Sequence, residues 1–82
     1  MKVENAEFNI TIDGKQYTAS AHKFKMQNYP QIHVVLDASD KKSYPFNFYE
    51  IEPQNFFWFE IPDKKQLIAK AIANRLKKVN FN

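Results

Sequence analysis

The sequence predicts an α+β domain, in which an antiparallel meander of four to five strands has one C-terminal amphipathic helix packed on one face. Three observations predict it. Apolar and polar side chains alternate over residues 6–12 and again after Gly14, short apolar segments separated by polar turns follow up to residue 61, and apolar residues recur at helical spacing beyond Pro62. A chain of 82 residues has room for one core, so we expect a single domain over residues 1–82.

The N-terminal part predicts a β-hairpin. Asp13 and Gly14 separate two alternating segments, and both tolerate the positive φ angles of a tight turn. A two-residue loop there sets three opposite pairs, namely Ile10 with Tyr17, Phe8 with Ala19 and Ala6 with Ala21. The other face then collects polar residues: Glu7, Asn9, Thr11, Gln16, Thr18 and Ser20. We therefore expect Phe8 and Ile10 to be largely buried, and Thr11 and Thr18 to be largely exposed.

Three more strands follow along the chain. Residues 32–36 and 44–48 alternate like strands and flank a polar turn cluster at residues 37–43. Pro45 cannot donate a ladder hydrogen bond, so it belongs near the start of the fourth strand or on an edge. Residues 23–28 fit either an extension of the second strand or a loop. The aromatic segment 56–61 favours a short fifth strand.

The facing of this fifth strand decides which aromatic rings are exposed. Successive side chains of a strand point to opposite faces, so the consecutive rings cannot all lie beneath the helix. We expect Phe57, Phe59 and Ile61 in the core, because the other set brings Glu60 inside. Trp58 then lies on the open face with Glu60.

The helix is expected over residues 63–79. Asp63 suits the N-cap, and Gln66 three residues later completes a capping-box pattern. One apolar stripe should pack across the sheet, formed by Leu67, Ile68, Ala71, Ile72, Leu76 and Val79.

Composition excludes several kinds of chemistry. The chain has no cysteine, which removes disulfides, thiolate nucleophiles and cysteine-based metal sites, and its single glycine excludes a Gly-rich phosphate loop. His22 and His33 have no spacing that requires them to be close, so we expect solvent-facing histidines and no metal site. We predict no cofactor, no catalytic residue and no enzymatic activity, because so small a sheet with one helix seldom contains a cleft.

Apolar runs are too short for a membrane span, and the N-terminus lacks the apolar stretch of a secretory signal, so we expect a cytoplasmic protein without a membrane partner. Charge is uneven along it. Residues 1–62 contain six lysines against eight acidic residues, whereas residues 63–82 contain five lysines and one arginine against one aspartate. Lys70, Lys77 and Lys78 could follow a nucleic-acid backbone, or they could simply form the solvated face of the helix.

Eight of the thirteen aromatic residues lie between residues 44 and 59. They could fill a small core, but one or two exposed rings would suit a partner. The sequence therefore predicts a non-catalytic binding domain, first of all a protein-interaction module that uses Tyr49, Phe56 and Trp58. The alternative is sequence-tolerant binding of single-stranded nucleic acid by the basic helix and exposed rings. An edge strand could also pair with a second copy of the chain.

Antiparallel strands followed by one C-terminal helix resemble the arrangement in the whirly family of single-stranded-DNA-binding proteins. The resemblance lies in the topology and implies a site for no particular residue of this chain.

Overall fold

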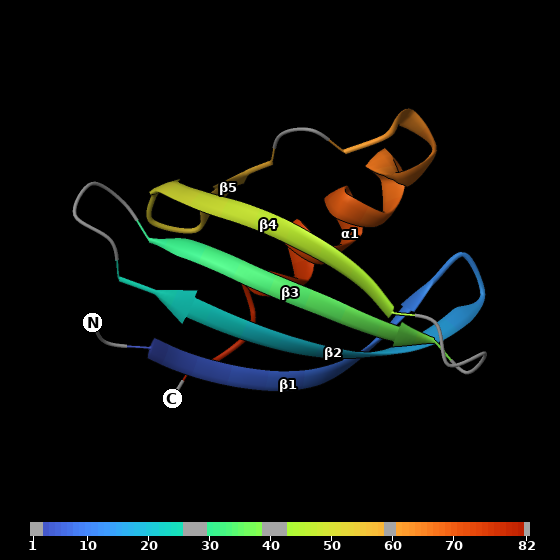
Figure 1. Cartoon of the computed structure of the whole chain (residues 1–82), viewed down its shortest axis with the longest axis horizontal. Helices are drawn as coiled ribbons and strands as arrows, with labels where there is room; N and C mark the ends of the chain where they lie inside the picture. The colour runs from blue at the N-terminus through green and yellow to red at the C-terminus, as the bar shows by residue number, and fades with distance from the viewer. Residues whose placement is uncertain (1–2, 26–29, 39–42, 59–60, 82) are drawn as a thin grey trace.

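The computed structural model describes residues 3–25, 30–38, 43–58 and 61–81. Five strands form one antiparallel sheet in the order β1-β2-β3-β4-β5, and a single C-terminal helix lies against one face of it (Figure 1). The predicted α+β meander is therefore confirmed. The elements are β1 (Val3–Ile12), β2 (Lys15–Phe24), β3 (Gln31–Ala38), β4 (Ser43–Glu52), β5 (Asn55–Phe57), the 3₁₀ turn η1 (Asp63–Lys65) and the helix α1 (Gln66–Leu76).

The hairpin of β1 and β2 has the predicted register. Ile10 lies opposite Tyr17, and the remaining pairs follow from a two-residue loop. Asp13 has a φ of 52° and Gly14 a φ of 79°, the positive angles that this turn requires. Ile10 is buried, and Thr11 and Thr18 are exposed as expected. Phe8 is only partly buried, because β1 is an edge strand with a neighbour on one side alone.

The middle of the sheet also follows the alternation in the sequence. β3 and β4 bury the expected residues, which are Ile32, Val34, Leu36, Phe46 and Phe48. Pro45 is the third residue of β4 and lies opposite Val35. β2 continues to Phe24, so the start of the ambiguous segment 23–28 is strand, and residues 26–29 lie outside the described residues.

The predicted facing of the fifth strand is wrong. Phe56 is 8% exposed and Phe57 is 42% exposed, the reverse of our expectation. An irregularity between Glu50 and Glu52 shifts the register, and it places Phe56 opposite Glu50 on the helix side of the sheet. β5 is also shorter than the predicted segment 56–61, while the expectations for Phe59 and Glu60 fall outside the described residues.

The helix differs from the prediction in both its start and its buried face. Residues 63–65 form a 3₁₀ turn and α1 begins at Gln66, so Asp63 makes no side-chain cap and the capping box is not formed. The buried residues are Ala69, Ile72, Ala73 and Leu76. Ile72 and Leu76 were expected, whereas Leu67 is 79% exposed because it lies two residues before Ala69, across the helix from this stripe.

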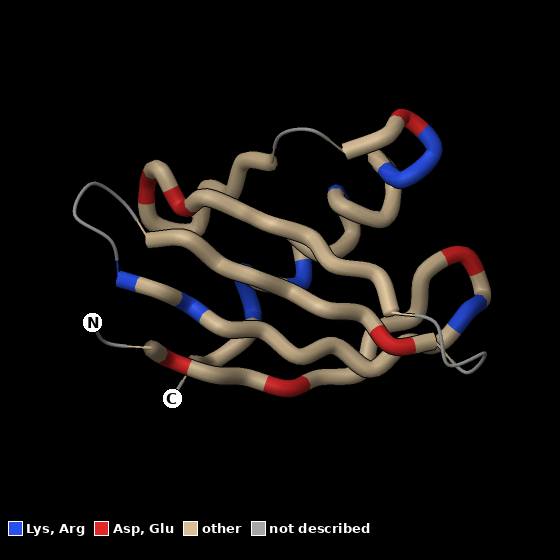
Figure 2. Tube along the Cα trace, in the orientation of Figure 1, with Lys and Arg blue, Asp and Glu red and all other residues tan. Residues whose placement is uncertain are grey.

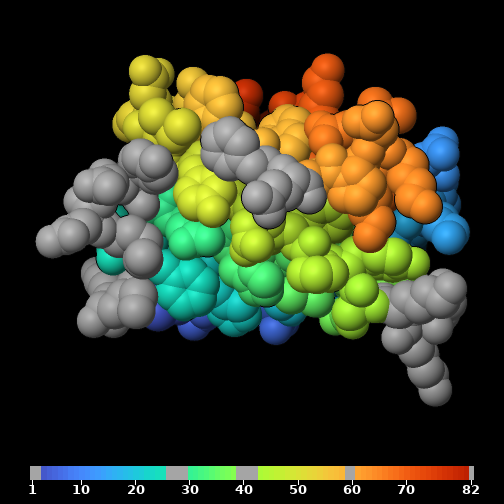
Figure 3. Space-filling model, turned by 45° about the horizontal axis from the view of Figure 1, so that its top comes forward, coloured from blue at the N-terminus to red at the C-terminus, as the bar shows by residue number. Residues whose placement is uncertain are grey.

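The core lies between the helix and one face of the sheet, and Figure 3 shows α1 beside the rim formed by β4 and β5. Phe81, beyond the helix, also packs against this core. In the described part of the chain, no helix has the length and apolar character needed to cross a membrane.

Candidate functional site

The face of the sheet opposite α1, which we call the open face, presents side chains in cross-strand rows. Four rows span at least four strands each, as given by the strand register. The aromatic row comprises Val3, Phe24, Gln31, Tyr49 and Phe57. The histidine row comprises Asn5, His22, His33 and Asn47. The third row comprises Glu7, Ser20, Val35 and Pro45, and the fourth row comprises Asn9, Thr18, Asp37 and Ser43.

The aromatic row is the most apolar part of this face. Val3 is 41% exposed at one end and Phe57 is 42% exposed at the other, while Phe24 and Tyr49 between them are partly buried. Of the residues that the sequence predicted for partner binding, Tyr49 belongs to this row. Phe24 was not among the residues expected to contact a partner, although it continues the alternation that places Thr18 on the same face of β2.

Trp58 does not lie on the open face, contrary to our expectation. It is partly buried against the core, where its ring meets that of Phe48 edge-on at 5.9 Å between centroids. Its indole Nε1 donates a hydrogen bond to Oε1 of Gln66 at 2.8 Å. Phe56 is buried in the same core and offers little surface to a partner. The predicted contact residues are thus divided between the interior and the surface.

The cationic side chains of the helix lie on the other side of the molecule from the aromatic row. Lys70, Lys77 and Lys78 are exposed on or just after α1, which covers the opposite face of the sheet. The four open-face rows contain no lysine or arginine, and their charged members are Glu7 and Asp37. Figure 2 marks the charged residues along the chain, and those of β4, Glu50 and Glu52, lie at the end of the strand that leads into β5.

Several cations instead lie over rings on the helix side. The guanidinium of Arg75 lies 5.6 Å from the ring centroid of Phe8, and the ammonium of Lys65 lies 5.2 Å from that of Tyr44. Contacts of this kind stabilise a fold by up to about 1 kcal/mol at exposed sites. The charges of Arg75 and Lys65 are therefore engaged in contacts within the molecule.

An ion pair joins β2 and β4 on the helix side. Nζ of Lys23 lies 2.8 Å from Oε1 of Glu50, and both side chains are largely shielded from solvent. Burial acts to raise the pKa of the Glu50 carboxyl, but the hydrogen bonds from Lys23 and from the Gln54 amide, with the charges of Lys23 and Lys25, outweigh it and lower this pKa. Lys23 also lies over the Phe81 ring at 5.6 Å. The pair therefore ties the C-terminal segment to the sheet.

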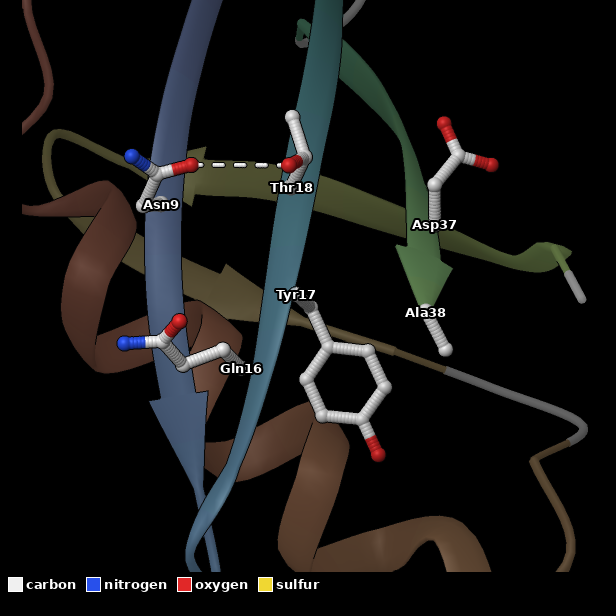
Figure 4. A pocket seen from close by; sticks show the side chains of 6 residues that line it. All are labelled: Asn9, Gln16, Tyr17, Thr18, Asp37 and Ala38. Carbon is white, nitrogen blue, oxygen red and sulfur yellow. Dashed lines mark hydrogen bonds between the residues drawn. The ribbon is translucent and has the colours of Figure 1, made fainter. Parts of the chain in front are cut away.

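A hollow lies at the end of the sheet where β2 begins and β3 ends, with lining residues from both faces (Figure 4). Its lining residues are Asn9, Gln16, Tyr17, Thr18, Asp37 and Ala38. The Thr18 hydroxyl donates to the amide oxygen of Asn9 at 3.5 Å, and the Asp37 carboxylate accepts a hydrogen bond from Ser43 at 2.7 Å. The Thr18 hydroxyl is thus bonded to an amide oxygen, which is not a general base.

The histidine row brings together two side chains whose spacing along the chain did not predict that they are close. His22 on β2 lies directly opposite His33 on β3. Nδ1 of His22 lies 2.6 Å from Oδ1 of Asn5, and Nδ1 of His33 lies 2.7 Å from Oδ1 of Asn47. Histidine, cysteine, aspartate and glutamate form no metal-binding cluster of three or more among the described residues.

Comparison with known proteins returned no match to this chain from family models, from curated proteins or from solved structures. The outline shared with the whirly proteins therefore remains a likeness of topology.

Proposed function

We propose that this chain is a non-catalytic binding domain that holds a protein partner on the open face of its sheet, at the aromatic row. The supporting observation is the exposure of Phe57 and Val3 at the two ends of a row that crosses five strands. Aromatic side chains are enriched at protein interfaces and often account for most of the binding energy. The partner surface is apolar where it meets this row.

The distribution of charge favours a protein over a nucleic acid. A single strand stacked on the aromatic row would have its phosphates near a face whose charged members are Glu7 and Asp37. The exposed lysines of the helix would be out of reach on the opposite side. Phosphate neutralisation supplies most of the affinity of sequence-tolerant nucleic-acid binding. The lysines that would neutralise phosphates and the rings that would stack with bases therefore lie on opposite sides of this molecule. A partner with basic residues around an apolar centre matches this face better.

Photo-crosslinking in native-host extract identifies the partner and locates its binding face. A photoreactive amino acid is placed at Phe57, with a matched control at Leu67, which is also apolar and exposed but lies on the helix side. We expect one defined protein to crosslink from position 57 and not from position 67. Crosslinking of the same proteins from both positions would contradict the proposed face.

Binding to the purified partner then measures the contribution of the row. Phe57→Ala should weaken binding about tenfold or more, the effect of losing an aromatic hot spot, and Leu67→Ala should leave it unchanged. Unchanged binding in Phe57→Ala, with the fold intact by circular dichroism, would refute the proposal.

Two further measurements separate the alternatives. A salt series with an arbitrary single-stranded oligonucleotide should show no binding, and steep salt-dependent binding abolished by replacing Lys70, Lys77 and Lys78 would establish the nucleic-acid function instead. Sedimentation over a range of concentrations tests a second copy as the partner. Self-association lost in Phe57→Ala would identify the partner as this chain, whereas self-association insensitive to Phe57→Ala would point to the free edge of β1 and against the aromatic row.

A further inference from the structure

We propose that His22 and His33 form a binding site for a divalent transition-metal ion on the open face, with Nε2 of each imidazole as the protein ligands. This site lies in the histidine row, and ion binding there does not depend on the identity of any protein partner.

The strand register places the two rings side by side. His22 and His33 are directly opposite in the antiparallel pairing of β2 and β3, and both side chains stand on the open face. Opposite residues of such a pair have Cβ atoms about 4.5 to 5.5 Å apart, a separation that two imidazoles bound to one ion can span. Both residues are only partly exposed, so the neighbouring side chains restrict their rings.

The hydrogen bonds of the row aim the two Nε2 atoms toward each other. Nδ1 of His22 is directed outward to Asn5 on β1, and Nδ1 of His33 is directed outward to Asn47 on β4. The two nitrogens of an imidazole leave the ring in directions that diverge by well over a right angle. With each Nδ1 turned away from the β2–β3 boundary, each Nε2 is turned back over it.

The same contacts set the tautomer of each ring in its neutral form. An amide oxygen accepts hydrogen bonds and cannot donate them, so each Nδ1 must hold a proton to contact Asn5 or Asn47. The lone pair of each neutral ring is then on Nε2, ready for a metal. Histidine ligands of metal sites almost always donate their other ring N–H to an oxygen acceptor in this way.

The charges near the two histidines favour the binding of a cation. The imidazole nitrogens determine which kind of cation binds. Glu7, which lies diagonally from His22 in the next row, adds a negative charge, and the open-face rows contain no lysine or arginine. Imidazole suits Cu²⁺, Ni²⁺ and Zn²⁺ rather than Mg²⁺ or Ca²⁺, and water completes the coordination. Cu²⁺ should bind more tightly than Zn²⁺, as the general order of divalent affinities requires.

Calorimetric titration of the untagged protein with Cu²⁺ and with Zn²⁺ tests the site. The chain contains two histidines and no cysteine, so competing strong ligands are few. We expect one ion per chain, and His22→Gln and His33→Gln should each weaken binding by about tenfold or more, since losing even a hydrogen-bonding partner of a ligand has that effect. Two ions per chain, with one retained at full affinity in each variant, would show independent histidines and overturn the proposal. So would equal affinity in the parent and both variants.

The asparagines allow a second test that a structural role would not reproduce. Asn47→Ala should weaken Zn²⁺ binding about tenfold, while Asn47→Asp should strengthen it, because a carboxylate acceptor makes the imidazole a better ligand. Asn9→Ala, in a different row of the open face, is the matched control and should change nothing. Equal affinities in Asn47→Ala and Asn47→Asp, with both variants folded, would refute the arrangement.

Thermal unfolding provides an independent readout. The site exists only while β2 and β3 are paired, so saturating Zn²⁺ should raise the Tm of the parent by linkage. The same Zn²⁺ should leave the Tm of His33→Gln unchanged. A similar rise in both proteins would place the ion elsewhere and contradict the proposal.

Discussion

The indole Nε1 of Trp58 donates a hydrogen bond to the side-chain oxygen of Gln66, the first residue of α1, at 2.8 Å. The side-chain nitrogen of Gln66 donates in turn to the backbone oxygen of Ile61 at 2.7 Å. One glutamine thus joins the residue that follows β5, the segment that enters the helix, and the helix itself. A residue that the sequence suggested for helix capping instead fixes the only tryptophan of the chain against the core.

Gln66→Ala should lower the free energy of unfolding by about 1 to 3 kcal/mol, because it leaves the partly buried Trp58 N–H and Ile61 oxygen without their partner. Chemical denaturation measures the loss, and a change in Trp58 fluorescence reports the altered surroundings of the ring. Gln16→Ala, at an exposed position of the open face, is the matched control and should stay within about 0.5 kcal/mol of the parent. Equal stability of the two variants would contradict the role given to Gln66.

Ile72→Ala should destabilise the fold by about 2 to 5 kcal/mol, since Ile72 is fully buried at the centre of the helix stripe and its loss leaves a cavity. Leu67→Ala, on the same helix, should change stability by less than about 0.5 kcal/mol because Leu67 is exposed. Thermal or denaturant unfolding compares the two. A larger loss in Leu67→Ala would mean that α1 presents its other face to the sheet.

Glu50 should make the fold sensitive to acid. Its pKa is lower in the folded chain than in the unfolded one, so its contribution to stability is fully present above the ordinary pKa of the carboxyl and is lost as pH falls through the lowered value. In Glu50→Gln, the free energy of unfolding should therefore fall less steeply as the pH decreases.

At neutral pH, the same change should cost about 1.5 to 3 kcal/mol, the range for hydrogen bonds to charged groups. The profile is measured by denaturation over a series of pH values. Glu52→Gln, which removes an exposed carboxylate from the same end of β4, is the control. Its free energy of unfolding should fall with decreasing pH as steeply as that of the parent. An unchanged profile in Glu50→Gln would show that the Lys23–Glu50 pair does not contribute to stability.

Gly14→Ala should destabilise the hairpin by about 1 to 2 kcal/mol through backbone strain alone. The φ of Gly14 is +79°, and a Cβ atom added there would meet nothing within 4 Å. Gly14→Asn should lose less stability, because asparagine tolerates positive φ better than alanine does. Urea denaturation measures both variants, and equal losses would indicate that the turn is not held in the left-handed region.

The register of the first hairpin could be predicted from local residues alone. Alternation identifies which side chains share a face, and a two-residue loop at Asp13-Gly14 then gives the pairing of Ile10 with Tyr17 by counting, whereas a loop one residue longer would have shifted it. The same period of two places Thr18 and Phe24 on the open face. Local rules suffice here because strand period and turn geometry are properties of a few neighbouring residues.

The facing of β5 depended on tertiary structure. A continuous apolar segment has no alternation, and the preference for keeping Glu60 out of the core was the only local argument for burying Phe57. The irregularity between Glu50 and Glu52 reversed the outcome, since one extra residue on one strand exchanges the two faces. This feature of β4 leaves no composition signal in the residues of β5.

The buried face of α1 was likewise decided by what it meets. Leucine is more apolar than alanine, which is why a stripe through Leu67 was expected. In the structure, Ala69 and Ala73 are instead buried in one cluster with Ala19 and Ala21 of the sheet. The buried face of the helix therefore contains two alanines and leaves the more apolar Leu67 exposed, which the hydrophobicity of the helix sequence alone does not predict.

The histidine row shows most clearly why part of the candidate site was beyond local reasoning. His22 and His33 belong to different strands, and the residues between β2 and β3 contain no short turn signal from which a register could be counted. Their alignment comes from the pairing of the whole strands, in which Ala19, Ala21, Val34 and Leu36 are buried on one face. Once that face is buried, the alternation of side chains leaves the two imidazoles opposite each other on the other face.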